Sequence, residues 1–450
     1  MKSPFNPLGI TFLAAGLAVS GCARKQVSLW QSLSNPDDVR QLKSFVTEKE
    51  AQADSSTNEP LPWYAAFLAA VNAGDWQTAS NLDDQARSLP YTDARAHGTR
   101  REIMKEISGA MDAFGPGDEK YVDQFASEII GSIPPGSIYF GGTDPGRFII
   151  TAMQKSQIKG DPFFTLTQNQ LADGGYLEYA SHMYGGRLYI PTVEDSQKCF
   201  NDYYADVQQR MQHGQLKPGE DVSVNPDTGK MTVSGQVAVM EINALLVKVI
   251  FDNNTNRDFY IEESYPLDWM YPYLEPHGLI FKLNHVPLDD LSDETVQKDH
   301  DYWSKTIKPM IGDWLTDDTS VADVAAFGQR VFLHHDFSGF TGDTNFVLNS
   351  YSYRSFSKLR SSIGGLYAWR AKNSDDTAEK ARMIRAADLA FRQAWALCPE
   401  SPEAVFRYAQ FLADQDRIHD ALLIADTAES FNSSTQFEGL VTSLKQYEKQ

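Results

Sequence analysis

The sequence predicts an α/β central domain with a mainly parallel sheet, flanked on both sides by α-helical hairpins. Three observations support this fold class. Short apolar strands alternate with helical segments over residues 129–290, which is typical of an α/β layer. Residues 59–128 and 357–450 instead carry small and apolar side chains at helical spacing. The 450 residues are more than one ordinary domain of about 100–200 residues, so they allow a central domain with helical arrays attached.

Composition and charge limit the classes of function. Hydrophobic residues make up 42% of the chain and aromatic residues 12%, which is a globular composition. Lys and Arg number 40 against 60 Asp and Glu, giving a formal net charge of −20. Such an excess of acid repels phosphate backbones, so nucleic acid is excluded as a general partner.

Residues 1–22 have the features of a secretion signal. Lys2 precedes an apolar run from Leu8 to Val19, which is too short for a transmembrane helix of about 20 residues. The end of the segment, Val-Ser-Gly-Cys at 19–22, resembles the lipobox of bacterial lipoproteins, in which the cysteine thiol carries the lipid. The resemblance implies lipidation at Cys22 and anchoring to a membrane of the bacterial cell envelope, facing the periplasm. Ala23 is not acidic, which slightly favours the outer membrane. The alternative is an ordinary signal peptide that contains a cysteine.

Helical segments lie on both sides of the central region. Residues 23–58 are expected to form a polar tether and a first helix, and residues 291–356 a helical connector. In 59–128, the pattern of Trp63, Gly74, Ala79 and Ala86 resembles the tetratricopeptide repeat. The resemblance is fuller in 357–450, where it rests on these residues: Ile363, Gly364, Tyr367, Ala387, Phe391, Ala394, Pro399, Tyr408, Ala409, Leu412, Ala421, Ala425 and Ala428. Generic helical hairpins are the alternative. Repeats of this kind usually bind protein segments, and the abundant acid of this chain suits basic ones.

The central region is predicted to contain four main strands, at 136–140, 163–168, 258–264 and 278–284. A helix is expected after each of the first two strands. Two further helices are expected at 194–214 and 235–253, with a turn at 227–229 between them. The last two strands are only about 15 residues apart and are candidates for an antiparallel pair at an edge. The proline- and aromatic-rich segment 265–278 is expected either to cover the sheet or to form an exposed aromatic patch.

This central region also resembles a soluble domain found in certain bacterial membrane proteins related to protein O-mannosyltransferases, a family of unknown function. The shared plan is a strand, an Asp-containing glycine-rich loop, an aromatic helix, the Phe-Tyr-Ile-Glu-Glu-Ser strand at 259–264 and the closing strand at 278–283. The resemblance implies the α/β fold and a role in the envelope. This chain lacks the membrane spans of those proteins, so no glycosyl-transfer reaction is carried over.

Ligand-binding candidates follow the predicted strands. In open α/β sheets, ligands bind outside the carboxyl ends of the strands. The residues placed there are Thr143, Asp144, Arg147, Asn169, Asp173 and Glu262. Glycines near Asp144 and the N-terminus of a helix starting at Pro145 favour the binding of an anion, and Arg147 would supply a matching charge. The alternative is structural, with Asp144 capping the helix and Arg147 paired to a nearby acid.

Catalytic patterns are absent from the sequence. His334 and His335 lack further ligands at a fitting spacing, so no metal site and no cofactor are expected. No Ser-His-Asp pattern or Gly-x-Ser-x-Gly elbow occurs. Cys199 and Cys398 are expected to be free and buried.

The sequence therefore favours a non-enzymatic, lipid-anchored scaffold that binds protein partners through its helical repeats. The alternative is that the α/β domain binds a sugar phosphate or similar polar ligand in envelope glycan metabolism.

Overall fold

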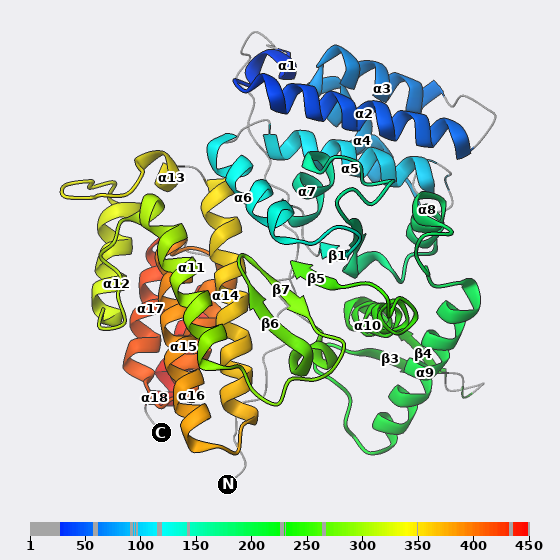
Figure 1. Ribbon diagram of the computed structural model, residues 1–450. Coiled ribbons are helices and arrows are strands. Elements are labelled where there is room, and N and C mark those ends of the chain that lie inside the picture. The colour runs from blue at the N-terminus through cyan, green and yellow to red at the C-terminus, as the bar shows by residue number, and fades with distance from the viewer. Residues whose placement is uncertain are drawn as a thin grey trace. The chain divides into compact units, whose positions relative to one another are not determined.

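The computed structural model describes residues 28–56, 62–90, 93, 95, 98–114, 119–141, 145–225, 229, 231–262, 267–348, 350–431 and 435–448. The described part of the chain is mostly helical (68%), with a small mixed sheet of five strands and a separate two-stranded ribbon (Figure 1). The predicted signal segment and Cys22 lie outside the described residues. Among the helices described, none is both long and apolar enough to cross a membrane.

Two compact units divide the chain, and neither is continuous in sequence. The first comprises residues 1–32, 46–108 and 167–256. The second comprises residues 33–45, 109–166 and 257–450. Helices α2 (Pro36–Ser56) and α5 (Thr99–Phe114) contribute residues to both units.

The five-stranded sheet has the order β2-β1-β5-β7-β6. Its strands are β1 (Ile138–Gly141), β2 (Phe164–Thr167), β5 (Phe259–Glu262), β6 (Leu274–His277) and β7 (Ile280–Leu283). β1 and β5 pair in parallel, whereas β7 is antiparallel to both β5 and β6. The expected mainly parallel sheet is therefore wrong, because a tight turn at Gly278 (φ 63°) returns the chain from β6 directly into β7. The expected antiparallel pairing of the last two predicted strands is confirmed as β5–β7, but their expected edge position is wrong, because β6 lies outside β7.

Strand β6 and η3 (Asp268–Tyr273) make up most of the proline- and aromatic-rich segment 265–278. Pro276 cannot donate a ladder hydrogen bond, which suits β6 to the edge position that it occupies. The preceding η3 (Asp268–Tyr273) buries Met270, and its Tyr271 stacks on Trp369 with ring centroids 5.4 Å apart. These two side chains of the segment pack within the second unit.

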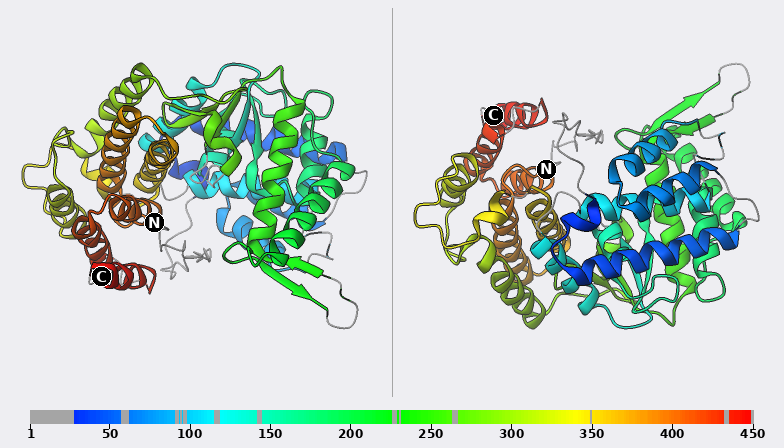
Figure 2. Two further views of the ribbon diagram at one scale, coloured as in Figure 1. Left: turned by 90° about the horizontal axis from the view of Figure 1, so that it is seen from below. Right: turned by 90° about the horizontal axis from the view of Figure 1, so that it is seen from above.

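The first unit contains helical hairpins and a small ribbon. Its other elements are α1 (Leu29–Ser32), α3 (Pro62–Ala73), α4 (Trp76–Arg87), η2 (Gln168–Gln170), α8 (Gly174–Tyr184), α9 (Val193–Gln212), β3 (Asp221–Val224), β4 (Met231–Ser234) and α10 (Gly235–Asn253). Gly74 has a φ of 72° between α3 and α4, and Asp75 caps α4 by accepting from the backbone N–H of Thr78. The ribbon projects from the α9–α10 pair (Figure 2) and is tied to α9 by Arg210, which donates to Glu220.

The second unit holds the sheet and the C-terminal helices. Its remaining elements are α6 (Glu119–Ser132), η1 (Pro145–Ile149), α7 (Ile150–Met153), α11 (Asp293–Ile311), α12 (Val321–Phe327), η4 (Gly328–Leu333), α13 (Thr344–Leu348), α14 (Ser350–Asn373), α15 (Thr377–Leu397), α16 (Pro402–Asp414), α17 (Ile418–Phe431) and α18 (Thr435–Glu448). Helix α14 packs against α15, α16, α6 and β7, so it is the central helix of this unit (Figure 1).

Small side chains allow the C-terminal helices to pack closely. Ala387, Ala409 and Ala421 are all fully buried. Gly364 on α14 faces the ring of Phe391 on α15, and a Cβ at position 364 would lie 2.9 Å from that ring. Helices therefore form where small and apolar residues at helical spacing predicted them.

The two described cysteines are in the state that the sequence predicts. Cys199 and Cys398 are free and buried, as expected. Burial raises the pKa of both thiols, so they stay protonated at neutral pH.

Two adjacent glycines test the close packing of α14 on α15. Gly365 has open space where a Cβ would be, so Gly365→Ala should raise the free energy of unfolding by about 0.5–1 kcal/mol through helix propensity. Gly364→Ala gains the same propensity but pushes against Phe391, and overpacking costs about 1–3 kcal/mol. Urea unfolding of both variants measures the difference. Equal stabilisation by both substitutions would contradict this packing.

Candidate functional site

Two of the predicted ligand-binding residues lie at the same edge of the sheet. Glu262 ends β5 and is the register partner of Gly141 at the end of parallel β1. Arg147 lies in η1, and its Cα approaches Gly141 so closely that a Cβ at 141 would lie 3.1 Å from it. The structure therefore brings Arg147 and Glu262 to the carboxyl ends of β1 and β5.

This sheet edge is tightly packed around Gly146. A Cβ at position 146 would overlap the carboxylate of Glu262, and the hydroxyl of Tyr139 donates to the carbonyl of Gly146 at 2.8 Å. Arg147 is 3% exposed and Glu262 2% exposed, so both charges are buried. Buried charges require partners, so these two residues have a structural role whatever else they do. Thr143 and Asp144 lie outside the described residues.

Asn169 and Asp173 belong to the first unit, whereas Arg147 and Glu262 belong to the second. The Asp173 side chain accepts from the N–H of Gly175 at 2.9 Å and so caps α8. The carbonyl of Asn169 accepts from the Asn243 side chain at 3.1 Å. Both residues therefore have structural contacts within the first unit.

His334 and His335, which were considered as metal ligands, are exposed at the end of η4. Within the described ranges there is no group of three or more His, Cys, Asp or Glu that could hold a metal ion.

A polar pocket of about 510 Å³ lies between α11, α14 and α15 in the second unit. Its lining consists of Val296, Gln297, Asp299, His300, Asp317, Arg360, Tyr367, Arg382, Arg385, Ala386, Asp388, Leu389 and Arg392. Small-ligand sites usually have volumes of roughly 300–1,000 Å³. The size and the many polar groups make this pocket a candidate binding site.

The floor of the pocket is a buried ion pair. Arg360 on α14 donates to Asp299 on α11 at 2.7 Å and to Gln393 on α15 at 2.8 Å. The Tyr367 hydroxyl donates to the same Asp299 oxygen at 2.9 Å. Burial and the charge of Asp299 raise the pKa of Tyr367 well above its ordinary value, so this hydroxyl remains a donor. The guanidinium of Arg360 also lies over the ring of Trp303, 5.1 Å from its centroid.

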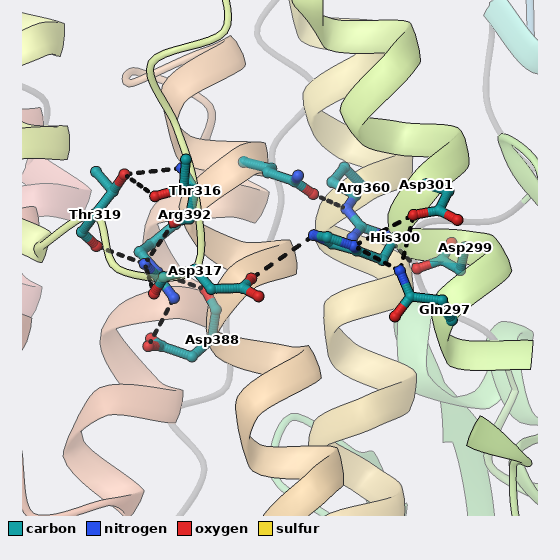
Figure 3. A network of polar contacts seen from close by, with 11 residues as sticks. Gln297, Asp299, His300, Asp301, Thr316, Asp317, Thr319, Arg360, Asp388 and Arg392 are labelled. Atoms are coloured by element: carbon teal, nitrogen blue, oxygen red, sulfur yellow. Dashed lines mark hydrogen bonds and ion pairs between the residues drawn. The ribbon is translucent and has the colours of Figure 1, made fainter. Parts of the chain in front are cut away.

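One wall of the pocket holds a loop against α15. Arg392 donates to the carbonyls of Thr316, at 3.2 Å, and Asp317, at 3.0 Å, as well as to that of Thr319 (Figure 3). Asp388 lies one turn away on α15, 3.4 Å from the same guanidinium. Because Arg392 is buried, these contacts fix the loop that follows α11.

The opposite wall is formed by α11. Gln297 lies within 3.3 Å of a ring nitrogen of His300, and His300 in turn lies 3.7 Å from carboxylate oxygens of Asp301 and Asp317. Figure 3 shows these side chains across from the Arg392 contacts. Carboxylates, guanidinium groups and an amide can form paired hydrogen bonds with a polar ligand.

The sequence did not lead to this pocket. Arg360 and Asp299 are 61 residues apart on different helices, and no local pattern connects them. One available signal was the face of α15, where Arg382, Arg385 and Arg392 follow helical spacing. A second was a charged residue, Arg360, inside a segment otherwise predicted to pack closely.

The described residues therefore form a mostly helical structure with a small mixed sheet and a polar pocket. Comparisons with protein-family models, with curated proteins and with solved structures give no match for this chain.

The buried pair in the pocket floor should dominate the stability of the second unit. Asp299→Ala leaves Arg360 charged and unpaired in the interior, which should lower the free energy of unfolding by about 3–5 kcal/mol. Asp313→Ala is the matched control, because it breaks the exposed pair with Lys308 just after the same helix. We expect little change there. Chemical denaturation of both variants tests this, and equal losses would contradict it.

Proposed function

We propose that this chain is a non-enzymatic scaffold of the bacterial cell envelope, anchored by lipid on Cys22, which binds protein partners through its C-terminal helical repeats. The observation that carries the proposal is the stacking of α14–α18. In this region α14 packs on α15, α16 on α17, and α17 on α18. A series of stacked hairpins is the architecture that repeat proteins use to bind protein segments.

The charge of the repeat surface supports a basic partner. Residues 402–448 carry eight Asp and Glu against three Lys and Arg, a net charge of −5. Several of these acids are exposed, among them Asp414 on α16, Asp426 on α17 and Glu438 on α18. Opposite charge steers association and disfavours acidic competitors. The proposed partner is therefore a protein that presents a basic segment.

The resemblances noted in the sequence remain part of this proposal. The lipobox-like end of the signal segment supports a membrane anchor, with a slight preference for the outer membrane. The likeness to the soluble domain of proteins related to O-mannosyltransferases supports an α/β region around the small sheet and a role in the envelope. Neither resemblance supplies a reaction.

Lipid attachment is tested with labelled palmitate. Cys22→Ser removes the thiol that would carry the lipid, so we expect the variant to take up no label and to leave the membrane fraction. Cys199→Ser is the control, because this cysteine is buried in the folded chain and should not affect labelling. If the parent chain itself takes up no label, an ordinary signal peptide explains residues 1–22 instead.

Partner binding is tested by cross-linking in the source cells. A photoreactive residue at Gln410 on α16 or Thr442 on α18, both exposed, should give discrete protein adducts. The same residue at exposed Gln209 on α9 is the positional control. Adduct yields at 410 and 442 no greater than at 209 would contradict the proposal.

The charge of the partner is tested in the same cells. Asp414→Asn with Glu438→Gln should lower the yield of adducts several-fold, because both changes remove negative charge from the repeat surface. Glu194→Gln with Asp202→Asn neutralises two exposed acids on α9 instead, and should leave the yield unchanged. Equal effects of the two pairs would show that net charge matters and the repeat surface does not.

A further inference from the structure

The pocket between α11, α14 and α15 has a charge opposite to that of the whole chain. Four arginines line it, at 360, 382, 385 and 392, against three aspartates, at 299, 317 and 388. With His300 neutral, the lining has a formal charge of +1, within a chain of −20. A concave site lined by excess positive charge attracts anions.

Three of these arginines are already engaged in the structure. Arg360 pairs with Asp299, and Arg392 donates to the carbonyls of the loop at 316–319. Arg382 donates to the carbonyl of Leu291 at 2.6 Å and pairs with Asp293. They shape the pocket and contribute charge, but their main hydrogen bonds are internal.

Arg385 differs from the other three. It is exposed on α15 at the pocket, and among the described residues it has neither a hydrogen bond nor an ion pair. A guanidinium presents five N–H donors in a fork that matches phosphate and carboxylate groups. Arg385 can therefore bind an anion without breaking any contact that holds the fold.

Asp299 supplies the second half of the argument. Asp299 is 5% exposed. One of its carboxylate oxygens, Oδ2, accepts hydrogen bonds from both Arg360 and Tyr367. The other oxygen, Oδ1, is buried and has no hydrogen-bond partner within the described part of the chain. A buried acceptor without a partner is costly, so Oδ1 calls for a donor from outside the protein. Because Asp299 lines the pocket, a bound molecule is a source of that donor.

We propose that this pocket binds a small anion that also carries hydroxyl groups, namely a phosphorylated or carboxylated sugar. The anionic group pairs with Arg385 at the pocket opening, and a hydroxyl donates to Asp299 Oδ1 at the floor. Gln297, His300 and Asp388 provide further hydrogen-bonding groups for a polyhydroxylated molecule. This site goes beyond the proposed partner binding, since it uses α11 and α15 and not the exposed faces of α16 and α18.

The experiment is calorimetric titration of the full chain in detergent micelles with four probes. Glucose 1-phosphate and glucuronate carry both an anion and hydroxyls, inorganic phosphate only the anion, and glucose only the hydroxyls. We expect one or both of the first two to bind, and the last two to bind at least about tenfold more weakly. Comparing glucose 1-phosphate with glucuronate shows whether phosphate or carboxylate is preferred.

Three variants locate the site. Arg385→Gln should weaken sugar-anion binding about tenfold or more, because it removes the free guanidinium. Lys380→Gln is the matched control, since it removes an exposed cation from the same helix outside the pocket lining, and it should bind as the parent does. Ala386→Trp fills the pocket while keeping every charge, and should abolish binding.

Several outcomes would overturn the proposal. If no probe binds at millimolar concentration, or if all three variants bind as the parent does, the pocket is not a sugar-anion site. If inorganic phosphate binds as tightly as the sugar anions, the hydroxyl contact is wrong. None of these results bears on partner binding, which the adducts at 410 and 442 test separately.

Discussion

The ion pair between Arg360 and Asp299 is the interaction on which the C-terminal half of the protein depends. Each residue lies in the interior, where an unpaired charge would cost several kcal/mol. Through Gln393 the pair also engages α15, so a single set of polar contacts fixes the relative positions of α11, α14 and α15. Buried serines on α14 also have hydrogen-bond partners on neighbouring helices. Ser357 donates to the carbonyl of Ala394 at 2.7 Å, which explains how a helix so rich in polar side chains can lie at the centre of the unit.

This arrangement separates the residues that hold the structure from the residue that is free to bind. Arg360 and Arg392 are committed to internal acceptors, and changing them would alter the fold before it altered any ligand contact. Arg385 on the same pocket wall has no such commitment among the described residues. The stability of the pocket and its binding capacity can therefore be changed independently. That separation is what makes the effect of Arg385→Gln on binding interpretable.

Helices were predictable from the sequence where local spacing determines them. Small residues such as Gly364 and Ala387 mark faces that must approach a neighbour, and Gly74 marks a turn, so the hairpins follow from local chemistry. The direction of the strands was less predictable. Strand β6 contains a proline and a glutamate and has no apolar alternation, so it was assigned to a cover or a patch, and the antiparallel part of the sheet was underestimated. The sequence placed Glu262 at the end of a strand, and in the structure it lies opposite Gly141 at the end of β1. The pocket was not predicted, because contacts such as Arg360 with Asp299 arise only from tertiary packing.

The sheet edge and the helical pocket of the second unit differ in how tightly their charged groups are packed. At the sheet edge, Gly146 packs against the Glu262 carboxylate so closely that no side chain fits at position 146. That contact and the burial of Arg147 give the charges there a structural explanation. Between α11, α14 and α15 the opposite holds, since a pocket of ligand size remains beside a free guanidinium and an acceptor without a partner. The exposed surface of α16–α18, where the proposed protein partner would bind, is acidic instead. A basic protein segment and a small anion would each be drawn to a different face, so the two proposed ligands would not compete directly.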